Sequence, residues 1–392
     1  MLDRFWVSNF KSLVNVEFRP AGVNLLVGAN NAGKTNLCHA LRFLALTARM
    51  PLDDAAKQCT AEPWNLPNVH SAEDVIELAA DCTLQSEGDN LQFFYNLKLV
   101  GQRNSGSKLA GRPFSVRGET LRVTGGRLVD QVLLQNTDGE VRLFHEVERY
   151  EVRTTAPAAA TMLYRLYDLQ TNRRANLFKR YLSSWAYYSL DPIELRSNVA
   201  TPMDRVLEPT GSNLCSVLHT LHGERPRDER KLVEAARLME PRLDLLSFQA
   251  PDPEHVYMFF EDKHSHRFGV QNVSDGTLRY LALCFLILGN RQESAALPAP
   301  PLVMIEEPEN GIYVGHLKPL FEKIEPSGAQ GQFIFTSHSP YFIDLFDGAL
   351  DGLHVVRMGP GHSTVLRPDR VKLEGLLGQF SLGEMHFRGL LE

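Results

Sequence analysis

The chain has 392 residues, 43% of them hydrophobic and 22% charged, with a formal net charge of -6. This composition excludes a disordered chain and a global basic field, so any nucleic-acid surface must be local. Five scattered cysteines predict reduced thiols rather than a disulfide framework or a zinc site. No export signal opens the sequence, and its longest apolar run, residues 280–288, is about half the length that spans a bilayer. We therefore expect a soluble, cytoplasmic protein.

Residues 1–150 alternate short β-type runs with turns, which predicts a β-rich lobe wrapped around one helix. The predicted strands are residues 5–7, 14–18, 23–27, 75–84, 91–100, 115–123 and 131–134. Lys11 follows the first of them, in the sequence Asn9-Phe10-Lys11-Ser12. Its side chain is placed either to reach a nucleotide or to lie exposed on a hairpin.

A glycine-rich loop follows the third predicted strand. Residues 28–35 read Gly-Ala-Asn-Asn-Ala-Gly-Lys-Thr, and Leu37, Leu41 and Leu44 continue at helical spacing. In such a strand-loop-helix, backbone N–H groups face phosphates, the lysine bridges the β- and γ-phosphates, and the threonine ligates Mg²⁺. A glycine-rich turn with a chance lysine is the alternative, but it does not explain the flanking strand and helix. The residues predicted to contact ATP are Asn30, Asn31, Ala32, Gly33, Lys34, Thr35 and Asn36.

Two stretches are locally basic. The first has only Glu119 in opposition and comprises Lys98, Arg103, Lys108, Arg112, Arg117, Arg122 and Arg127. The second lies in a helical segment, where tyrosines alternate with Arg165, Arg173, Arg174, Lys179 and Arg180. Both are interpreted as solvated charged faces or, alternatively, as surfaces for a nucleic-acid backbone.

The pattern becomes helical from about residue 157 to Pro241, and one helix is predicted to run from Asp228 to Met239. Further on, the sequence Ser274-Asp275-Gly276-Thr277 enters an apolar helix. Taken alone, this is a helix cap with a tight turn. Its alternative role is a second anion site at a helix N-terminus.

Two acidic residues end the apolar run 301–305. Adjacent strand residues point to opposite sides of a sheet, so Glu306 and Glu307 should have different roles. Glu306 is predicted to hold Mg²⁺ together with Thr35, and Glu307 to polarise the attacking water. A solvated acidic strand end is the alternative. Another apolar run, 332–335, leads to Thr336-Ser337-His338, and His338 is either structural or senses the γ-phosphate.

This ordered set of motifs resembles the RecF, Rad50 and SMC-type ABC ATPases, and most of all the small AAA15 or OLD-like ATPases. The resemblance covers residues 1–150 and 245–392. It implies an α/β fold: a P-loop ABC-type ATPase head with a β-rich lobe and a parallel, RecA-like core. The expected units are an N-terminal half with the P-loop (1–150), a helical insertion (151–245), and a C-terminal half with the signature loop, Walker B strand and switch histidine (246–392).

The resemblance also implies a mechanism. Two heads sandwich ATP and Mg²⁺, so Ser274, Asp275 and Gly276 of one copy cap the nucleotide held by Lys34 of the other. Glu307 and His338 would be catalytic, and Lys11 would contact the nucleotide. The expected partners are a second copy of the chain, a separate effector such as a nuclease, and DNA.

The sequence departs from the family in several places. Glu306 replaces the usual aspartate, and residues 311–314 read Gly-Ile-Tyr-Val instead of glycine, a hydrophobic residue, histidine and proline. A glutamine that couples Mg²⁺ to the insertion is not evident, and Gln135 and Gln170 are the candidates. About fifty residues follow His338, too few for a nuclease domain.

These features leave two functions open. The chain is expected to be an ATP-hydrolysing head that regulates an effector in DNA repair or anti-phage defence. The alternative is a weakly hydrolysing, nucleotide-gated scaffold that holds a protein partner. A GTPase or small-molecule kinase is disfavoured because no Asn-Lys-x-Asp motif occurs.

Overall fold

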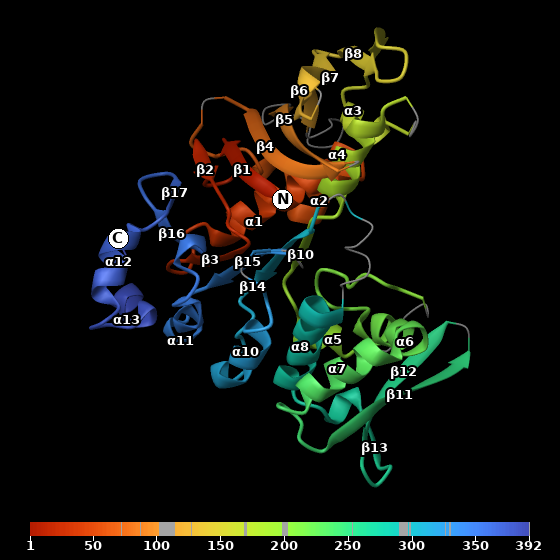
Figure 1. Ribbon diagram of the computed structural model, residues 1–392, viewed down its shortest axis with the longest axis vertical. Helices are drawn as coiled ribbons and strands as arrows, with labels where there is room; N and C mark the ends of the chain where they lie inside the picture. The colour runs from red at the N-terminus through yellow and green to blue at the C-terminus, as the bar shows by residue number, and fades with distance from the viewer. Residues whose placement is uncertain are drawn as a thin grey trace.

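The computed structural model describes residues 1–71, 73–86, 88–101, 114–126, 128–167, 171–197, 203–252, 254–289, 297, 299–325, 327–328 and 331–391. Its elements form three layers along the long axis (Figure 1): an antiparallel sheet, a mostly parallel sheet, and a lobe of helices with a small sheet. The predicted α/β class is confirmed.

The central sheet has six strands in the order β10-β14-β15-β3-β16-β17. All neighbours pair in parallel except the edge strand β17. Every residue of β3 and β15 is buried, as a sheet covered on both faces requires. The strands are β3 (Val23–Val27), β10 (Ala186–Tyr188), β14 (Leu302–Glu306), β15 (Gln332–Ser337), β16 (Leu353–Met358) and β17 (Ser363–Leu366).

The carboxyl ends of the parallel strands β3, β14 and β15 lie at one edge of this sheet, where ligand sites of α/β proteins are found. The glycine-rich loop follows β3, Glu306 ends β14, and His338 follows β15. Helix α1 (Lys34–Thr47) leaves the loop and buries Leu37, Leu41 and Leu44, as their spacing predicts. Helices α2 (Leu52–Cys59) and α4 (Arg173–Ser183) pack against it.

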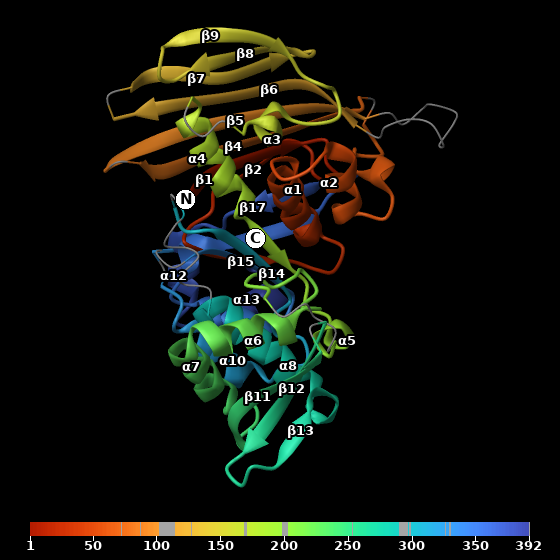
Figure 2. The same cartoon turned by 90° about the vertical axis from the view of Figure 1, so that its right-hand side faces the viewer.

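The outer sheet covers these helices (Figure 2). It is antiparallel, in the order β2-β1-β4-β5-β6-β7-β8-β9. Its strands are β1 (Leu2–Ser8), β2 (Val16–Phe18), β4 (Val75–Ser86), β5 (Asp89–Gly101), β6 (Phe114–Gly125), β7 (Leu128–Thr137), β8 (Glu140–His145) and β9 (Tyr150–Thr155). All seven predicted strands are present. The last two strands, β8 and β9, were not predicted. All six residues of β9 are exposed, although its sequence begins with an apolar-polar alternation, Tyr-Glu-Val-Arg.

The third layer covers the other face of the central sheet. It contains α6 (Leu214–Glu224), α7 (Pro226–Ala236), α8 (Asp275–Cys284), β11 (Leu243–Asp252), β12 (His255–Asp262) and β13 (Arg267–Gly269). Helix α7 corresponds to the helix predicted from Asp228. After α8 the chain continues as one π-helical turn, Phe285–Gly289. The short helices elsewhere are α3 (Met162–Arg165), α5 (Pro192–Leu195), α10 (Val314–Phe321), α11 (Pro340–Ile343), α12 (Arg370–Leu376) and α13 (Leu382–Phe387).

The interval 151–245 is not the purely helical insertion that the sequence pattern indicates. It contains most of β9, and it also supplies β10, the edge strand of the central sheet. Three residues are too few to show a strand periodicity, which is why β10 escaped prediction. All five cysteines are buried free thiols, as expected. Within the described ranges, the helices are too short or too polar to cross a membrane.

Candidate nucleotide site

Glycines are required at both ends of the loop between β3 and α1. Gly33 has a φ of 107°, and a Cβ placed there would lie 2.2 Å from Ser363 Oγ. At Gly28 a Cβ would lie 2.2 Å from the carbonyl oxygen of Val356. Asn31 adopts a left-handed φ of 64°, which asparagine tolerates better than most residues. Asn30, Asn31 and Thr35 are exposed, whereas Ala32 and Gly33 are buried against the rest of the head.

Lys34 lies inside this loop. Its Nζ donates to the carbonyl oxygens of Gly28 at 2.7 Å and Ala29 at 3.1 Å, and the residue is only 6% exposed. Burial lowers the pKa of this ammonium, while Glu307 and Glu306 oppose the shift. The Lys34 ammonium therefore donates to uncharged backbone carbonyls. An anion would be a stronger hydrogen-bond acceptor for this positive charge.

The loop is braced from two sides. Ser363 Oγ at the start of β17 donates to the Ala32 carbonyl at 2.7 Å and lies 2.7 Å from Ser12 Oγ. Asn36 Nδ2 in turn donates to Ser12 Oγ at 2.7 Å. Asn36 is thus engaged in holding the loop to the turn after β1.

Lys11, in the same turn, is directed at α1. Its Nζ lies 2.8 Å from Nδ1 of His39, and burial lowers the pKa of the Lys11 ammonium. His39 Nε2 is 3.2 Å from the Tyr187 hydroxyl on β10. Burial lowers the pKa of His39 to about 3, so its imidazole is neutral. Sequence reasoning missed His39 and Tyr187, because a single histidine on a helix and an aromatic in a three-residue strand carry no motif.

Glu306 faces the first turn of α1. Hydrogen bonds from Thr35 and Tyr187 stabilise its charged form, but burial dominates and raises the pKa of the carboxyl group. Glu306 Oε1 is buried and has no hydrogen-bond partner. A buried carboxylate oxygen without a partner, beside a threonine hydroxyl, is the donor set that a hard divalent cation prefers. The residues present therefore fit Mg²⁺.

Glu307 turns away from its neighbour because its backbone is left-handed, with a φ of 43°. Such a conformation costs a non-glycine residue on the order of 1–3 kcal/mol. Its Oε2 accepts a 2.7 Å hydrogen bond from Asn310 Nδ2, and its Oε1 lies 3.1 Å from His338 Nδ1. The structure thus brings the predicted base and the predicted switch histidine into direct contact.

Glu309 is a third carboxylate in this region. It accepts a short hydrogen bond from Ser337 Oγ, and its Oε2 is buried without a partner. Burial raises the pKa of the Glu309 carboxyl group. Ser337 Oγ also accepts from the backbone N–H of Ser339 at 3.0 Å, so Glu309 helps to hold the loop that carries His338. Glu309 lies two positions after Glu307, and sequence reasoning assigned it no role.

The Ser274 loop begins α8, on the face of the central sheet opposite α1 (Figures 1 and 2). Ser274 Oγ accepts from the Thr277 N–H at 3.1 Å, which is the helix-cap geometry. Gly276 lies against the loop after β14, which carries Glu307 and Glu309. A Cβ on Gly276 would be 2.2 Å from the Gly311 carbonyl oxygen in that loop. In the part of the chain that the structure describes, neither Ser274 nor Asp275 bonds to a P-loop residue. One chain therefore does not assemble the whole predicted nucleotide site.

Gln135 lies exposed on β7 of the outer sheet, so it does not reach this region, and Gln170 lies outside the described residues. No sequence pattern indicated where a glutamine that couples Mg²⁺ to the insertion would lie. From the edge strand, the Tyr187 hydroxyl acts on Glu306 and opposes the rise of its pKa.

Part of the positive charge of the first basic stretch is offset by acidic residues on neighbouring strands. Lys98 pairs with Glu77 at 3.1 Å and Arg122 with Asp130 at 3.2 Å, both across neighbouring strands. Glu119 does not oppose these charges, because it is buried under the sheet. Arg103, Lys108, Arg112 and Arg127 lie outside the described residues.

The second basic stretch is tied to its surroundings. Lys179 Nζ donates to the carbonyl oxygens of Tyr164 and Leu166 and lies 4.8 Å from the ring centre of Tyr167. Arg174 pairs with Glu146, whose carboxylate also accepts the Arg174 backbone N–H. These contacts favour the interpretation of a helix pair with a charged face.

Three solved structures resemble the whole chain. An SMC head bound to the C-winged helix domain of ScpA is 14% identical, with 95% of this chain and 99% of that chain covered and a TM-score of 0.53. An SMC head domain with an extended coiled coil, bound to the C-terminal domain of ScpA and derived from Pyrococcus furiosus, is 12% identical, with coverages of 96% and 98% and a TM-score of 0.53. An SMC head domain with a coiled coil and joint from Pyrococcus yayanosii is 12% identical, with coverages of 96% and 99% and a TM-score of 0.51.

At these identities the likeness concerns the fold, and it confirms the predicted SMC- and ABC-like ATPase head. No curated protein matches the sequence. One family model does, over residues 148–344, which is half of the chain; it is AAA_21, described as "AAA domain, putative AbiEii toxin, Type IV TA system". The chain therefore belongs to the AAA_21 family of AAA domains and has the fold of an SMC-type ATPase head.

Proposed function

We propose that this protein binds and hydrolyses ATP at the carboxyl edge of β3, β14 and β15. The observation that carries the proposal is the buried Glu306 Oε1, which lacks a partner beside Thr35 while the Lys34 ammonium occupies backbone carbonyls. Both groups are prepared for ligands that the chain itself does not supply. A triphosphate with a divalent cation would satisfy both at once.

Each P-loop residue then has a role in binding. The N–H groups from Asn30 to Asn36 face the phosphates, and the Lys34 ammonium leaves its carbonyls to bridge the β- and γ-phosphates. Thr35 and Glu306 would hold Mg²⁺, which neutralises charge on the phosphate oxygens when bound. Lys11 contributes a positive charge from the turn after β1.

Glu307 is the proposed general base. Asn310 holds one of its oxygens and His338 the other, so the carboxylate is oriented before water arrives. His338, which follows strand β15, would also donate to the γ-phosphate. Because Glu307 contacts His338 directly, a change in the contact of His338 with the phosphate would shift the Glu307 carboxylate.

The Ser274 loop requires a second copy. Because one chain leaves residues 274–276 on the opposite face from α1, we propose that two heads pair, each capping the ATP of the other. Two of the similar SMC heads were crystallised with a domain of ScpA, which supports a head that works with a separate protein. The proposed partner is an effector, a nuclease being one candidate, and the process is DNA repair or anti-phage defence in the cytoplasm. DNA contact would add to this role.

A nucleotide-gated scaffold is the second candidate. It is favoured by one observation: both carboxylate oxygens of Glu307 are engaged by side chains, and its backbone is strained. In this alternative the same two contacts withhold the carboxylate from water instead of orienting it, so the ATP-bound pair would persist and hold its partner.

The test is ATP binding and phosphate release by the purified chain across a range of protein concentrations, with Mg²⁺ and with EDTA. The ATPase proposal expects Mg²⁺-dependent release whose rate per molecule rises with protein concentration. Tight binding with association but negligible release would favour the scaffold. Absence of ATP binding would refute both.

A further inference from the structure

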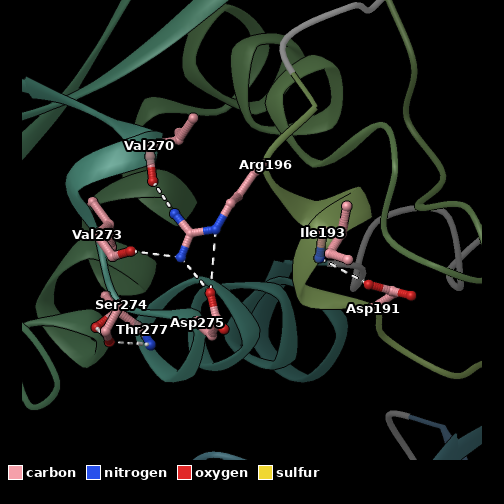
Figure 3. Close-up of polar contacts among 8 residues, drawn as sticks. All are labelled: Asp191, Ile193, Arg196, Val270, Val273, Ser274, Asp275 and Thr277. Carbon is pink, nitrogen blue, oxygen red and sulfur yellow. Dashed lines mark hydrogen bonds and ion pairs between the residues drawn. The ribbon is translucent and has the colours of Figure 1, made fainter.

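Arg196 ends the short helix α5 and reaches across to the loop before α8 (Figure 3). The helix is capped by Asp191, whose Oδ1 accepts the Ile193 N–H at 2.8 Å. This cap fixes the backbone from which Arg196 extends. The Arg196 side chain is 20% exposed, so its position is set by packing as well as by charge.

All three guanidinium nitrogens of Arg196 are used. Nη1 donates to the Val270 carbonyl at 2.5 Å, and Nη2 donates to the Val273 carbonyl at 2.8 Å. Nε donates to Asp275 Oδ1 at 3.2 Å, and Nη2 makes a short ion pair with the same oxygen. The planar fork thus anchors the backbone before Ser274 and the side chain after it, a pattern that lysine has no geometry to copy.

Asp275 presents an electrostatic difficulty for the proposed function. A carboxylate in the first turn of a helix stabilises that helix, but here it stands next to Ser274, where a phosphate is proposed to arrive. Two negative charges at one helix N-terminus repel each other. Of the positive groups around Asp275, Arg196 touches it, whereas Arg279 acts on it at longer range and is bonded to the carbonyls of Asn310 and Leu190.

We propose that Arg196 is a positioning residue that makes the 274–276 loop receptive to phosphate by compensating the charge of Asp275. The inference rests on the proposed pairing of two heads on ATP. Arg196 does not touch the nucleotide. It removes the repulsion that Asp275 would exert on the phosphate.

The experiment compares the wild type with Arg196→Gln and with the double variant Arg196→Gln/Asp275→Asn. Self-association is measured by sedimentation velocity with a non-hydrolysable ATP analogue, and ATP affinity is measured on dilute protein. The single variant should raise the midpoint concentration of association by about tenfold or more, with ATP affinity unchanged. The double variant should recover most of that loss, because the uncompensated charge is gone.

Arg196→Lys keeps a cation without the fork and should associate within about threefold of the wild type. It also serves if Arg196→Gln fails to fold. A matched control is Arg370→Gln, which removes a guanidinium paired with Asp351 and Glu374 on the surface of α12. This control should leave the midpoint unchanged.

The outcomes distinguish a failure of the Arg196 proposal from a failure of the proposed pairing of heads. If the wild type associates on ATP and Arg196→Gln associates equally well, the Arg196 proposal is wrong and the proposed function stands. A loss that Asp275→Asn does not recover, or an equal loss in Arg196→Lys, shows a purely structural anchor and also overturns it. If the wild type itself does not associate on ATP, the proposed pairing fails and the Arg196 proposal fails with it.

Discussion

His338 Nδ1 lies 3.1 Å from Glu307 Oε1, so the side chains that follow two neighbouring parallel strands meet at the end of the sheet. The contact is possible because Glu307 adopts a left-handed backbone, which turns its carboxylate toward β15. In their proposed roles as base and phosphate sensor, these two groups would respond to the same event.

We predict that Lys34→Ala and Glu307→Gln fail at different steps. Loss of the Lys34 ammonium should weaken ATP binding by at least about tenfold, because a charge-assisted contact to the phosphates disappears. Glu307→Gln should bind ATP normally and release phosphate about 10²–10⁴-fold more slowly, because an amide does not accept the proton. Equilibrium binding and phosphate-release assays measure the two effects. Turnover at the wild-type rate in Glu307→Gln would show that another group is the base.

The second prediction concerns His338. Replacing it with alanine should lower turnover by about tenfold or more, since Glu307 loses one of its two orienting contacts, while ATP affinity changes little. Single-turnover phosphate release separates this loss from slower product release. An unchanged single-turnover rate would leave His338 with a structural role only.

Ser274→Arg should block ATP-dependent association without unfolding the monomer. Ser274 is exposed at the start of α8, so a long side chain has room in one chain but would occupy the space of the partner's phosphate. Size-exclusion chromatography with and without an ATP analogue measures association, and the unfolding temperature controls for folding. Unchanged association would mean that the oligomer, if formed, uses another surface.

A fourth prediction tests the buried carboxyl group of the outer sheet. Glu119 accepts hydrogen bonds from the Tyr95 hydroxyl at 2.9 Å and from the N–H groups of Met162 at 2.6 Å and Leu163 at 2.9 Å. Burial nevertheless raises the pKa of Glu119 from 4.5 to about 7. Because the folded state holds this proton more tightly, the stabilisation is complete below pH 4.5 and is lost as the pH rises to about 7.

The free energy of unfolding should therefore fall across this window, by an amount on the order of 1–3 kcal/mol. Glu119→Gln keeps an acceptor for the backbone N–H groups and does not titrate, so its decline should be smaller. Urea unfolding of both proteins at pH 5 and pH 7.5 gives the comparison. Parallel pH dependences would show that Glu119 is ionised in the folded protein throughout.

Each element that was predicted correctly has a strong local sequence pattern of its own. The apolar runs of β3, β14 and β15 and the spacing of Leu37, Leu41 and Leu44 each follow from burial on known faces, and the glycine-rich loop follows from phosphate geometry. These features predict that the P-loop and the two strand ends lie at one edge of a sheet.

The parts that were missed depend on contacts between distant segments. Tyr187 and Arg196 are ordinary residues in the sequence, and their roles appear only when β10 pairs with β14 and α5 packs against α8. Glu119 is a similar case, because it lies in a basic stretch of the sequence while its neighbours in space are backbone N–H groups and the Tyr95 hydroxyl. Local patterns do not carry such information.

Gly276 and Gly311 meet with no side chain between them, and a Cβ on Gly276 would fall 2.2 Å from the Gly311 carbonyl oxygen. The two backbones are therefore packed too closely to admit a side chain, so a shift of the loop after β14 would press directly on the first turn of α8. Any free energy by which a ligand at one loop shifts the other is then returned in full in the opposite direction. A nucleotide bound by one head would sense the arrival of the second head to the same degree that the second head senses the nucleotide.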